Sequence, residues 1–148
     1  MLEKKGEKRR KAARLIVLGA ALLLGALLFA ANGIRGEQNA RTAEARLKYI
    51  RSLGWEAVPD CEEREEVRIP DCSKEPMLSY NELMRRGGFD LSGCEGKTVE
   101  RYSYELSNYP GCADRVYLIL YVHRGRVVGG DIHTAELDGF MHELRARE

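Results

Sequence analysis

A short stretch near the C-terminal end, residues 129–142, holds the side chains best suited to acid–base chemistry or metal binding. On a strand, Asp131 and His133 share a face because side chains alternate with a period of two. On a helix that follows, Asp138 and His142 share a face because they lie four residues apart. Two imidazoles and two carboxylates could hold a divalent metal or move a proton, provided that the two faces converge. The alternative is an exposed strand end followed by a solvated helix face.

Glycines and tyrosines cluster around the same predicted strands. Gly129 and Gly130 lie inside a strand, where glycine normally weakens the element. Close packing of a helix on the sheet, or space for facing tyrosines, explains them, and approach of a ligand to the bare backbone is the alternative. The tyrosines suit core packing with hydroxyls at the rim, or a groove for carbohydrate or peptide; they are Tyr102, Tyr104, Tyr109, Tyr117 and Tyr121.

Other catalytic signatures are absent from the sequence. It contains no Gly-x-Ser-x-Gly or Ser-x-x-Lys nucleophile motif and no phosphate-binding loop. The sequence therefore favours a non-enzymatic protein without a cofactor. A metal- or carboxylate-dependent hydrolase using the four residues above remains the enzymatic alternative.

Four cysteines fall in the C-terminal three quarters of the chain, an even number that permits disulfides in an oxidising compartment. Three pairings are possible, and we favour Cys61 with Cys72 and Cys94 with Cys112, because each pair flanks one candidate element. Zinc binding is the alternative, although no Cys-x-x-Cys spacing occurs.

The periodicity of apolar residues predicts the elements that must position these side chains. Helices are expected over 42–53 and 73–86 and as a C-terminal helix capped by Thr134; strands are expected over 55–58, 66–69, 98–106, 116–123 and 126–133. The strand 66–69 should lie at an edge because Pro70 follows it. The strand 116–123 should be central because both of its faces are apolar. The order predicts an α+β domain with a mostly antiparallel sheet packed by helices.

The N-terminal part reads as a membrane anchor. Residues 1–14 carry seven basic and two acidic side chains, and residues 15–31 form an apolar run without a polar side chain. Counted through Ile34, the run reaches about 30 Å as a helix, enough to cross a bilayer. The charge bias predicts a cytoplasmic tail (1–14), a transmembrane helix (15–34), a stem (35–41) and an extracytoplasmic domain (42–148). A signal peptide cleaved near Gly33, which would leave a secreted soluble protein, and a buried soluble helix are the alternatives.

Several short strings resemble a family of small bacterial, Clostridia-type, membrane-anchored proteins catalogued as domain of unknown function 4830. The strings are Gly54-Trp-Glu-Ala-Val58, Val67-Arg-Ile-Pro70, Tyr80-Asn-Glu-Leu83, Gly88-Phe-Asp-Leu-Ser92, Gly96–Tyr104, Asn108-Tyr-Pro110, Val128–Ile132 and Leu137–Met141. The resemblance covers about residues 40–145 and implies one N-terminal transmembrane helix. The family has no assigned activity, so the resemblance transfers no catalytic residues to this sequence.

Together these observations predict a single-pass membrane protein whose outer domain binds or regulates a protein or another component of the cell envelope. Residues 15–148 hold 17 basic and 21 acidic side chains, a net charge of −4. A mildly acidic domain argues against nucleic acid as the partner.

Overall fold

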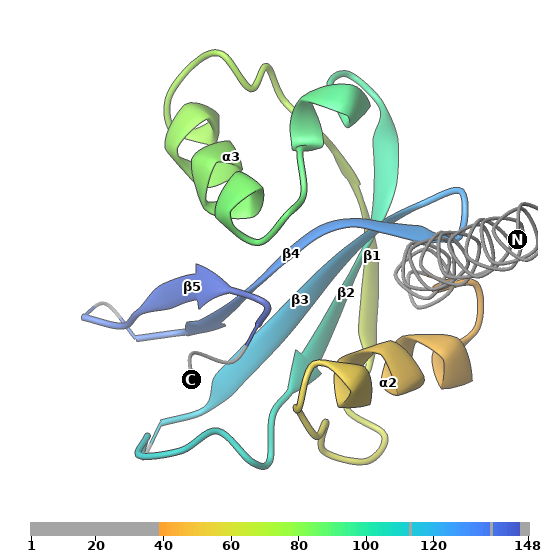
Figure 1. Ribbon diagram of the computed structural model, residues 1–148, viewed down its shortest axis with the longest axis vertical. Helices are drawn as coiled ribbons and strands as arrows, with labels where there is room; N and C mark the ends of the chain where they lie inside the picture. Colours follow the sequence, from red (N-terminus) through yellow and green to blue (C-terminus); the bar gives the residue numbers. More distant parts are fainter. Residues whose placement is uncertain (1–38, 113, 137, 146–148) are drawn as a thin grey trace, which may run out of the picture. The chain divides into compact units, whose positions relative to one another are not determined.

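The computed structural model describes residues 39–112, 114–136 and 138–145. The predicted tail, the predicted transmembrane helix and most of the predicted stem lie outside these ranges. Within them, no helix is long and apolar enough to span a bilayer. The elements run in the order α2 (Ala43–Ser52), β1 (Glu63–Arg68), α3 (Met77–Arg86), the 3-10 helix η1 (Leu91–Cys94), β2 (Thr98–Glu105), β3 (Val116–His123), β4 (Arg126–Thr134) and β5 (Met141–Glu143) (Figure 1).

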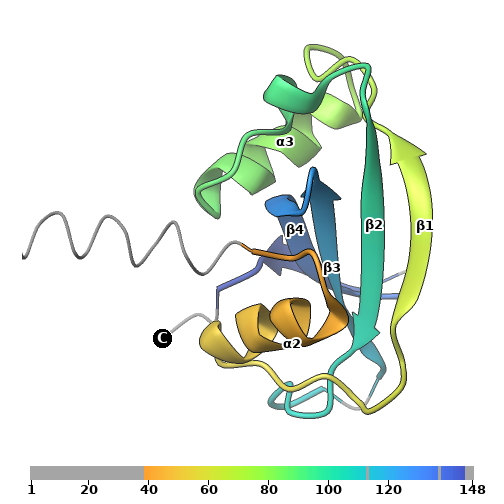
Figure 2. The same ribbon diagram turned by 90° about the vertical axis from the view of Figure 1, so that its right-hand side faces the viewer.

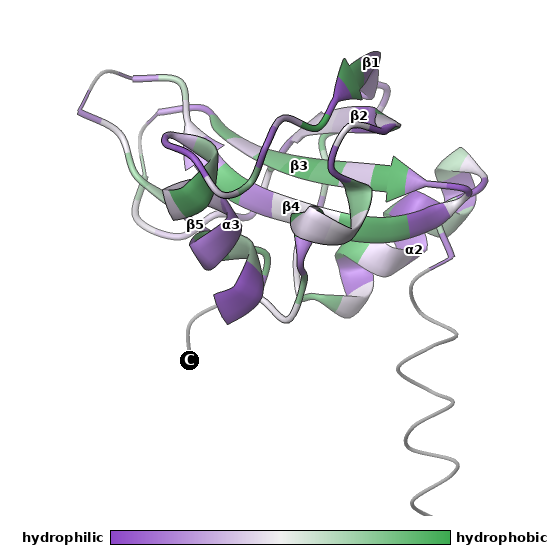
Figure 3. Cartoon of the chain, turned by 90° about the horizontal axis from the view of Figure 1, so that it is seen from above, coloured by the Kyte–Doolittle hydropathy of each residue, from purple (hydrophilic) through white to green (hydrophobic). Residues whose placement is uncertain are grey.

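The five strands form one antiparallel sheet in the order β1-β2-β3-β4-β5. The predicted α+β class with a mostly antiparallel sheet is therefore confirmed. β3 is the central strand, as its two apolar faces predicted, and Figure 3 shows it as an almost continuous hydrophobic band. β1 lies at one edge with charged, exposed side chains, which guard an edge against pairing with other chains.

Both expected internal helices are present; α2 lies within one residue of its predicted ends, whereas α3 begins four residues after the predicted start and ends at the predicted residue. The hydroxyl of Thr42 accepts a hydrogen bond from the Ala45 amide at 3.1 Å and caps α2. Gly54 follows with φ +90°, a conformation that glycine adopts at helix ends without strain. α3 starts after Pro76 and is followed by Gly88 with φ +86°.

The two helices cover opposite faces of the central strands. Side chains from alternate positions of β2 and β3, such as Tyr104 and Leu120, pack with Ile50 of α2. The intervening positions form a second cluster with Met84 of α3 and Leu91 of η1. Figures 1 and 2 show α2 and α3 at opposite ends of the sheet.

The predicted strand 55–58 is replaced by a single β-bridge between Ala57 and Leu106. The Val58 amide donates to the carbonyl of Glu105, and the Ser107 amide donates to that of Glu56, each at 2.8 Å. The segment runs beside the end of β2, but it is too short to form a ladder before Pro59, which has no amide to donate.

The predicted C-terminal helix is wrong: after a turn, the chain returns as β5 and pairs with β4. The apolar positions fit a helical period and also fit alternation, because Phe140 and Leu144 face the interior on either side of His142. The unpaired edge of β4 decides the outcome, since it offers hydrogen bonds to an extended chain. Thr134, predicted as a helix cap, ends β4, and its hydroxyl accepts from the Phe140 amide at 3.3 Å.

The glycine pair in β4 permits close packing, as one interpretation predicted. A Cβ on Gly129 would lie 2.9 Å from Leu91 and 3.3 Å from the sulfur of Met84. A Cβ on Gly130 would collide with the carbonyl oxygen of Ile119 and lie 2.9 Å from Leu144. Backbone cannot yield as a flexible side chain can, so Gly130 is the more constrained position.

We expect Gly130→Ala to lower the free energy of unfolding by about 1–3 kcal/mol, because the new methyl group forces the strands apart. Urea unfolding followed by circular dichroism measures the change. Gly93→Ala is the matched control, since nothing lies within 4 Å of its added Cβ. Equal stabilities of the two variants would contradict this packing.

Candidate functional site

Asp131 and His133 meet on the α3 face of β4, as the sequence predicted. Nδ1 of His133 lies 2.6 Å from Oδ1 of Asp131, and Asp131 is 1% exposed. The carboxylate accepts from Nδ1, which leaves Nε2 as the nitrogen that could take a proton or a ligand. The side chain of His133 is 21% exposed, so this nitrogen lies near the surface.

Tyr80 of α3 completes the surroundings of the buried carboxylate. Its hydroxyl donates to Oδ2 of Asp131 and lies 3.3 Å from the hydroxyl of Tyr121. Burial and the adjacent Asp131 charge raise the pKa of Tyr80 far above its ordinary value, and burial also raises the pKa of Tyr121. Both phenols therefore remain neutral over the physiological range and act as hydrogen-bonding groups.

The polar contacts continue across the sheet to its β1 edge. Register places Tyr121 opposite Arg101, and Arg101 opposite Glu65. Arg101 lies beside Tyr121 in the sheet and forms an ion pair with Glu65. A continuous polar row thus links β1, β2, β3, α3 and β4, ending at His133.

The contacts in this row join elements of the fold to one another and lack the groups that a reaction centre needs. Within the described ranges, no three His, Cys, Asp or Glu side chains are grouped to hold a metal ion. Within the described part of the chain, His133 contacts Asp131 and Tyr117 and no serine or cysteine nucleophile. An imidazole oriented by a carboxylate is competent as a base, but a base needs a reacting group beside it.

The other two predicted candidates lie elsewhere. Asp138 is exposed in the turn before β5. His142 pairs in register with Ile132, whose side chain packs in the α2-side cluster, and its ring joins the aromatic residues there. The sheet backbone therefore separates His142 from Asp131 and His133, and the four residues do not converge.

His142 belongs instead to a stack of four rings. Tyr109 stacks on Trp55 with ring centres 5.5 Å apart and on Phe140 at 5.0 Å. His142 stacks on Phe140 at 5.6 Å, and its Nε2 lies 3.0 Å from the Tyr109 hydroxyl. Nδ1 of His142 donates to the Glu143 carbonyl at 2.7 Å, so Nε2 accepts from the tyrosine when the ring is neutral.

These rings line a groove of about 560 Å³ at the β5 end of the domain, which we call the aromatic groove. It is formed by Gly54, Trp55, Asn108, Tyr109, Pro110, Phe140, Met141 and His142. Three parts of the chain are held in place here: the indole of Trp55 donates to the Leu144 carbonyl at 2.7 Å, and the amide of Asn108 donates to the Gly54 carbonyl at 2.9 Å. Met141 is 50% exposed and offers apolar surface beside the rings.

The sequence did not indicate this groove, because Trp55 was assigned to a strand and Phe140 to a helical stripe. The five predicted tyrosines also do not form one set. Tyr102 and Tyr104 face α2, Tyr121 faces α3, and only Tyr109 lines the groove. The alternation of Phe140, His142 and Leu144 could have indicated a strand that places these side chains on one face.

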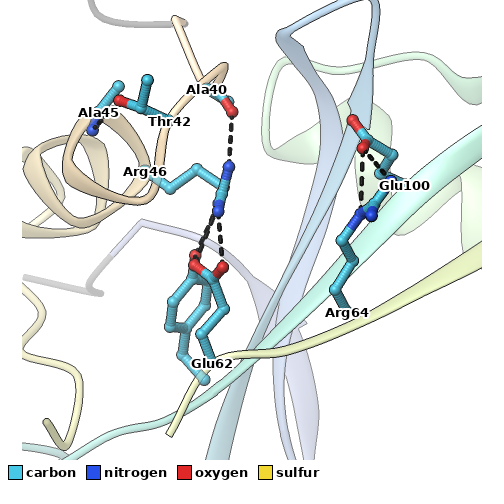
Figure 4. A network of polar contacts seen from close by, with 8 residues as sticks. Ala40, Thr42, Ala45, Arg46, Glu62, Arg64 and Glu100 are labelled. Atoms are coloured by element: carbon cyan, nitrogen blue, oxygen red, sulfur yellow. Dashed lines mark hydrogen bonds and ion pairs between the residues drawn. The ribbon is translucent and has the colours of Figure 1, made fainter. Parts of the chain in front are cut away.

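A second groove, of about 520 Å³, lies between α2 and residues 56–62. Beside it, Arg46 is 5% exposed and donates to Glu62 at 2.6 and 3.1 Å, to Tyr104 at 2.9 Å and to the Ala40 carbonyl at 3.0 Å (Figure 4). Its guanidinium also lies 3.7 Å from the centre of the Tyr102 ring. We call these contacts the Arg46 network.

Opposing effects act on the carboxyl of Glu62. Burial raises its pKa, but hydrogen bonds from Arg46 and Tyr104 outweigh burial and hold the pKa below the ordinary 4.5. A lowered pKa in the folded state stabilises the fold above about pH 4.5, and this contribution is lost as the pH falls through the folded-state pKa.

We expect Glu62→Gln to lower the free energy of unfolding by about 1–2 kcal/mol at pH 7, a value reduced for the partial exposure of Glu62. This loss of stability should shrink below pH 4.5. Urea unfolding of both proteins at pH 7 and pH 3 measures the difference. Glu63→Gln serves as the control, since Glu63 forms no ion pair within the described part of the chain. A cost that stays constant between the two pH values would argue against the Arg46 network.

The four cysteines are free thiols in this structure. Cys61 and Cys112 pack at the margin of the α2-side cluster, whereas Cys72 and Cys94 lie in the α3-side cluster. Each favoured pair would therefore join one cysteine from each cluster. Burial raises the pKa of the Cys72 thiol, which disfavours its reactive thiolate.

Comparison with family models, curated proteins and solved structures returned no match. The resemblance to domain of unknown function 4830 stays a prediction.

Proposed function

We propose that this domain is a non-enzymatic binding module, held outside the membrane by the N-terminal apolar segment, and that it binds an extended segment of an envelope protein in the aromatic groove. The observation that carries the proposal is the groove itself, in which four stacked rings from distant parts of the chain border an open volume of about 560 Å³. Ligand sites are typically concave and lined by aromatic and apolar groups.

The adjoining strand favours an extended peptide as the ligand. β5 is an edge strand with three residues, and it contributes Met141 and His142 to the groove. An extended segment could pair with such an edge and place alternate side chains among the rings, as in binding by strand addition. The exposed thioether of Met141 adapts to different apolar side chains.

The use of the polar side chains argues against the hydrolase alternative. Asp131 already binds His133 and Tyr80, and Glu62 already binds Arg46 and Tyr104. These contacts hold elements together and leave no described group of three metal ligands. A binding module needs no such group.

In-cell photocrosslinking tests the proposal with the full chain. We expect a benzophenone amino acid at Met141 to capture one defined envelope protein, because this position borders the groove. Leu78 on α3 is the matched control, since among the described residues it is the other exposed large apolar side chain, at 36%.

A synthetic peptide from the captured protein should then compete with the crosslink in membranes. The proposal fails if positions 141 and 78 capture the same set of proteins, or if the peptide does not compete.

A further inference from the structure

We propose that three arginines at the β3–β4 hairpin form a docking surface for anionic phospholipid headgroups, which fixes how the domain lies on the membrane. This inference rests on the membrane anchoring proposed above. We call Arg41, Arg124 and Arg126 the arginine cluster. All three side chains are exposed.

The fold gathers the three arginines at one point. Arg124 and Gly125 form the tight turn, with φ of +51° and +74°, and Arg126 begins β4. Asn39 forms a β-bridge with Arg126, and the Ala40 amide donates to the Gly125 carbonyl at 2.9 Å. The side chain of Arg41 then crosses the turn, so that a Cβ on Gly125 would lie 2.8 Å from its Nε.

The arginine cluster is not neutralised by the described part of the domain. None of its members forms an ion pair with another described residue. Glu100, opposite Val122 near the end of β3, is held by Arg64 at 2.7 Å. Residues 15–148 carry a net charge of −4, so three adjacent unpaired arginines form a local exception on an acidic domain.

The length of the connection brings this surface to the membrane. The apolar run ends at Ile34, and the domain begins at Asn39, five residues later. A fully extended connection of this length spans at most about 18 Å. The headgroup layer is about 5–8 Å thick on each side of the bilayer, so the hairpin stays within a short distance of lipid phosphates. Where the facing leaflet contains anionic lipid, each basic side chain near it gains about fivefold in partitioning.

The test uses the full chain in nanodiscs of phosphatidylcholine, with or without 30% phosphatidylglycerol. Phenylglyoxal modification of each arginine is followed by mass spectrometry, with Arg51 and Arg86 as exposed controls on other parts of the domain. We expect phosphatidylglycerol to slow modification of the arginine cluster at least threefold and to leave the controls unchanged. Salt at 0.5 M should abolish the protection, because it screens exposed charges.

A matched pair of variants removes equal charge at two places. R124Q with R126Q should abolish the lipid-dependent protection of Arg41, whereas R51Q with R86Q should preserve it. Equal modification rates in the two nanodiscs would overturn the inference. Equal protection by inorganic phosphate in phosphatidylcholine nanodiscs would also overturn it, by showing that free phosphate suffices. A chain that elutes without lipid would instead overturn the proposed anchoring.

Discussion

The Arg46 network is the interaction on which the rest of the domain depends. One buried guanidinium binds the start of the domain at Ala40, the approach to β1 at Glu62 and the middle of the sheet at Tyr104. Because a buried charge is costly without partners, removing one of these contacts should weaken the packing of the guanidinium. They fix α2 on its face of the sheet, and α2 in turn leads directly to Trp55 and the aromatic groove. The hydrogen bond to the Ala40 carbonyl also holds the residue that immediately precedes Arg41 of the arginine cluster.

The two faces of the sheet divide the chemistry of the domain. On the α3 face, a polar row ends in Asp131 and His133, and the hydrogen bonds of Tyr80 join α3 to β3 and β4. On the α2 face, apolar packing extends to the β5 end, where stacked rings border open space. Titratable side chains therefore serve mainly to hold elements, while aromatic side chains supply the surface available for binding. This division supports the proposal that the domain binds a partner at the aromatic groove.

The sequence predicted those parts of the fold that local patterns determine. Alternation identified β2, β3 and β4, helical spacing of apolar residues located both internal helices, and a spacing of two placed Asp131 beside His133. It failed where tertiary contacts decide between two patterns: residues 140–144 fit both a helix and a strand, and the free edge of β4 selected the strand. The aromatic groove was beyond local patterns because its rings come from positions 55, 109 and 140–142, which only the folded sheet brings together.

One comparison tests most directly whether the aromatic groove or the Asp131–His133 pair is the functional surface. The crosslink from position 141 is measured in cells for Phe140→Ser, which removes a ring of the stack, and for His133→Gln, which removes the imidazole on the opposite face; circular dichroism confirms that each variant is folded. The account predicts loss of the crosslinked partner in the Phe140 variant and its retention in the His133 variant. Loss in the His133 variant with retention in the Phe140 variant would contradict it.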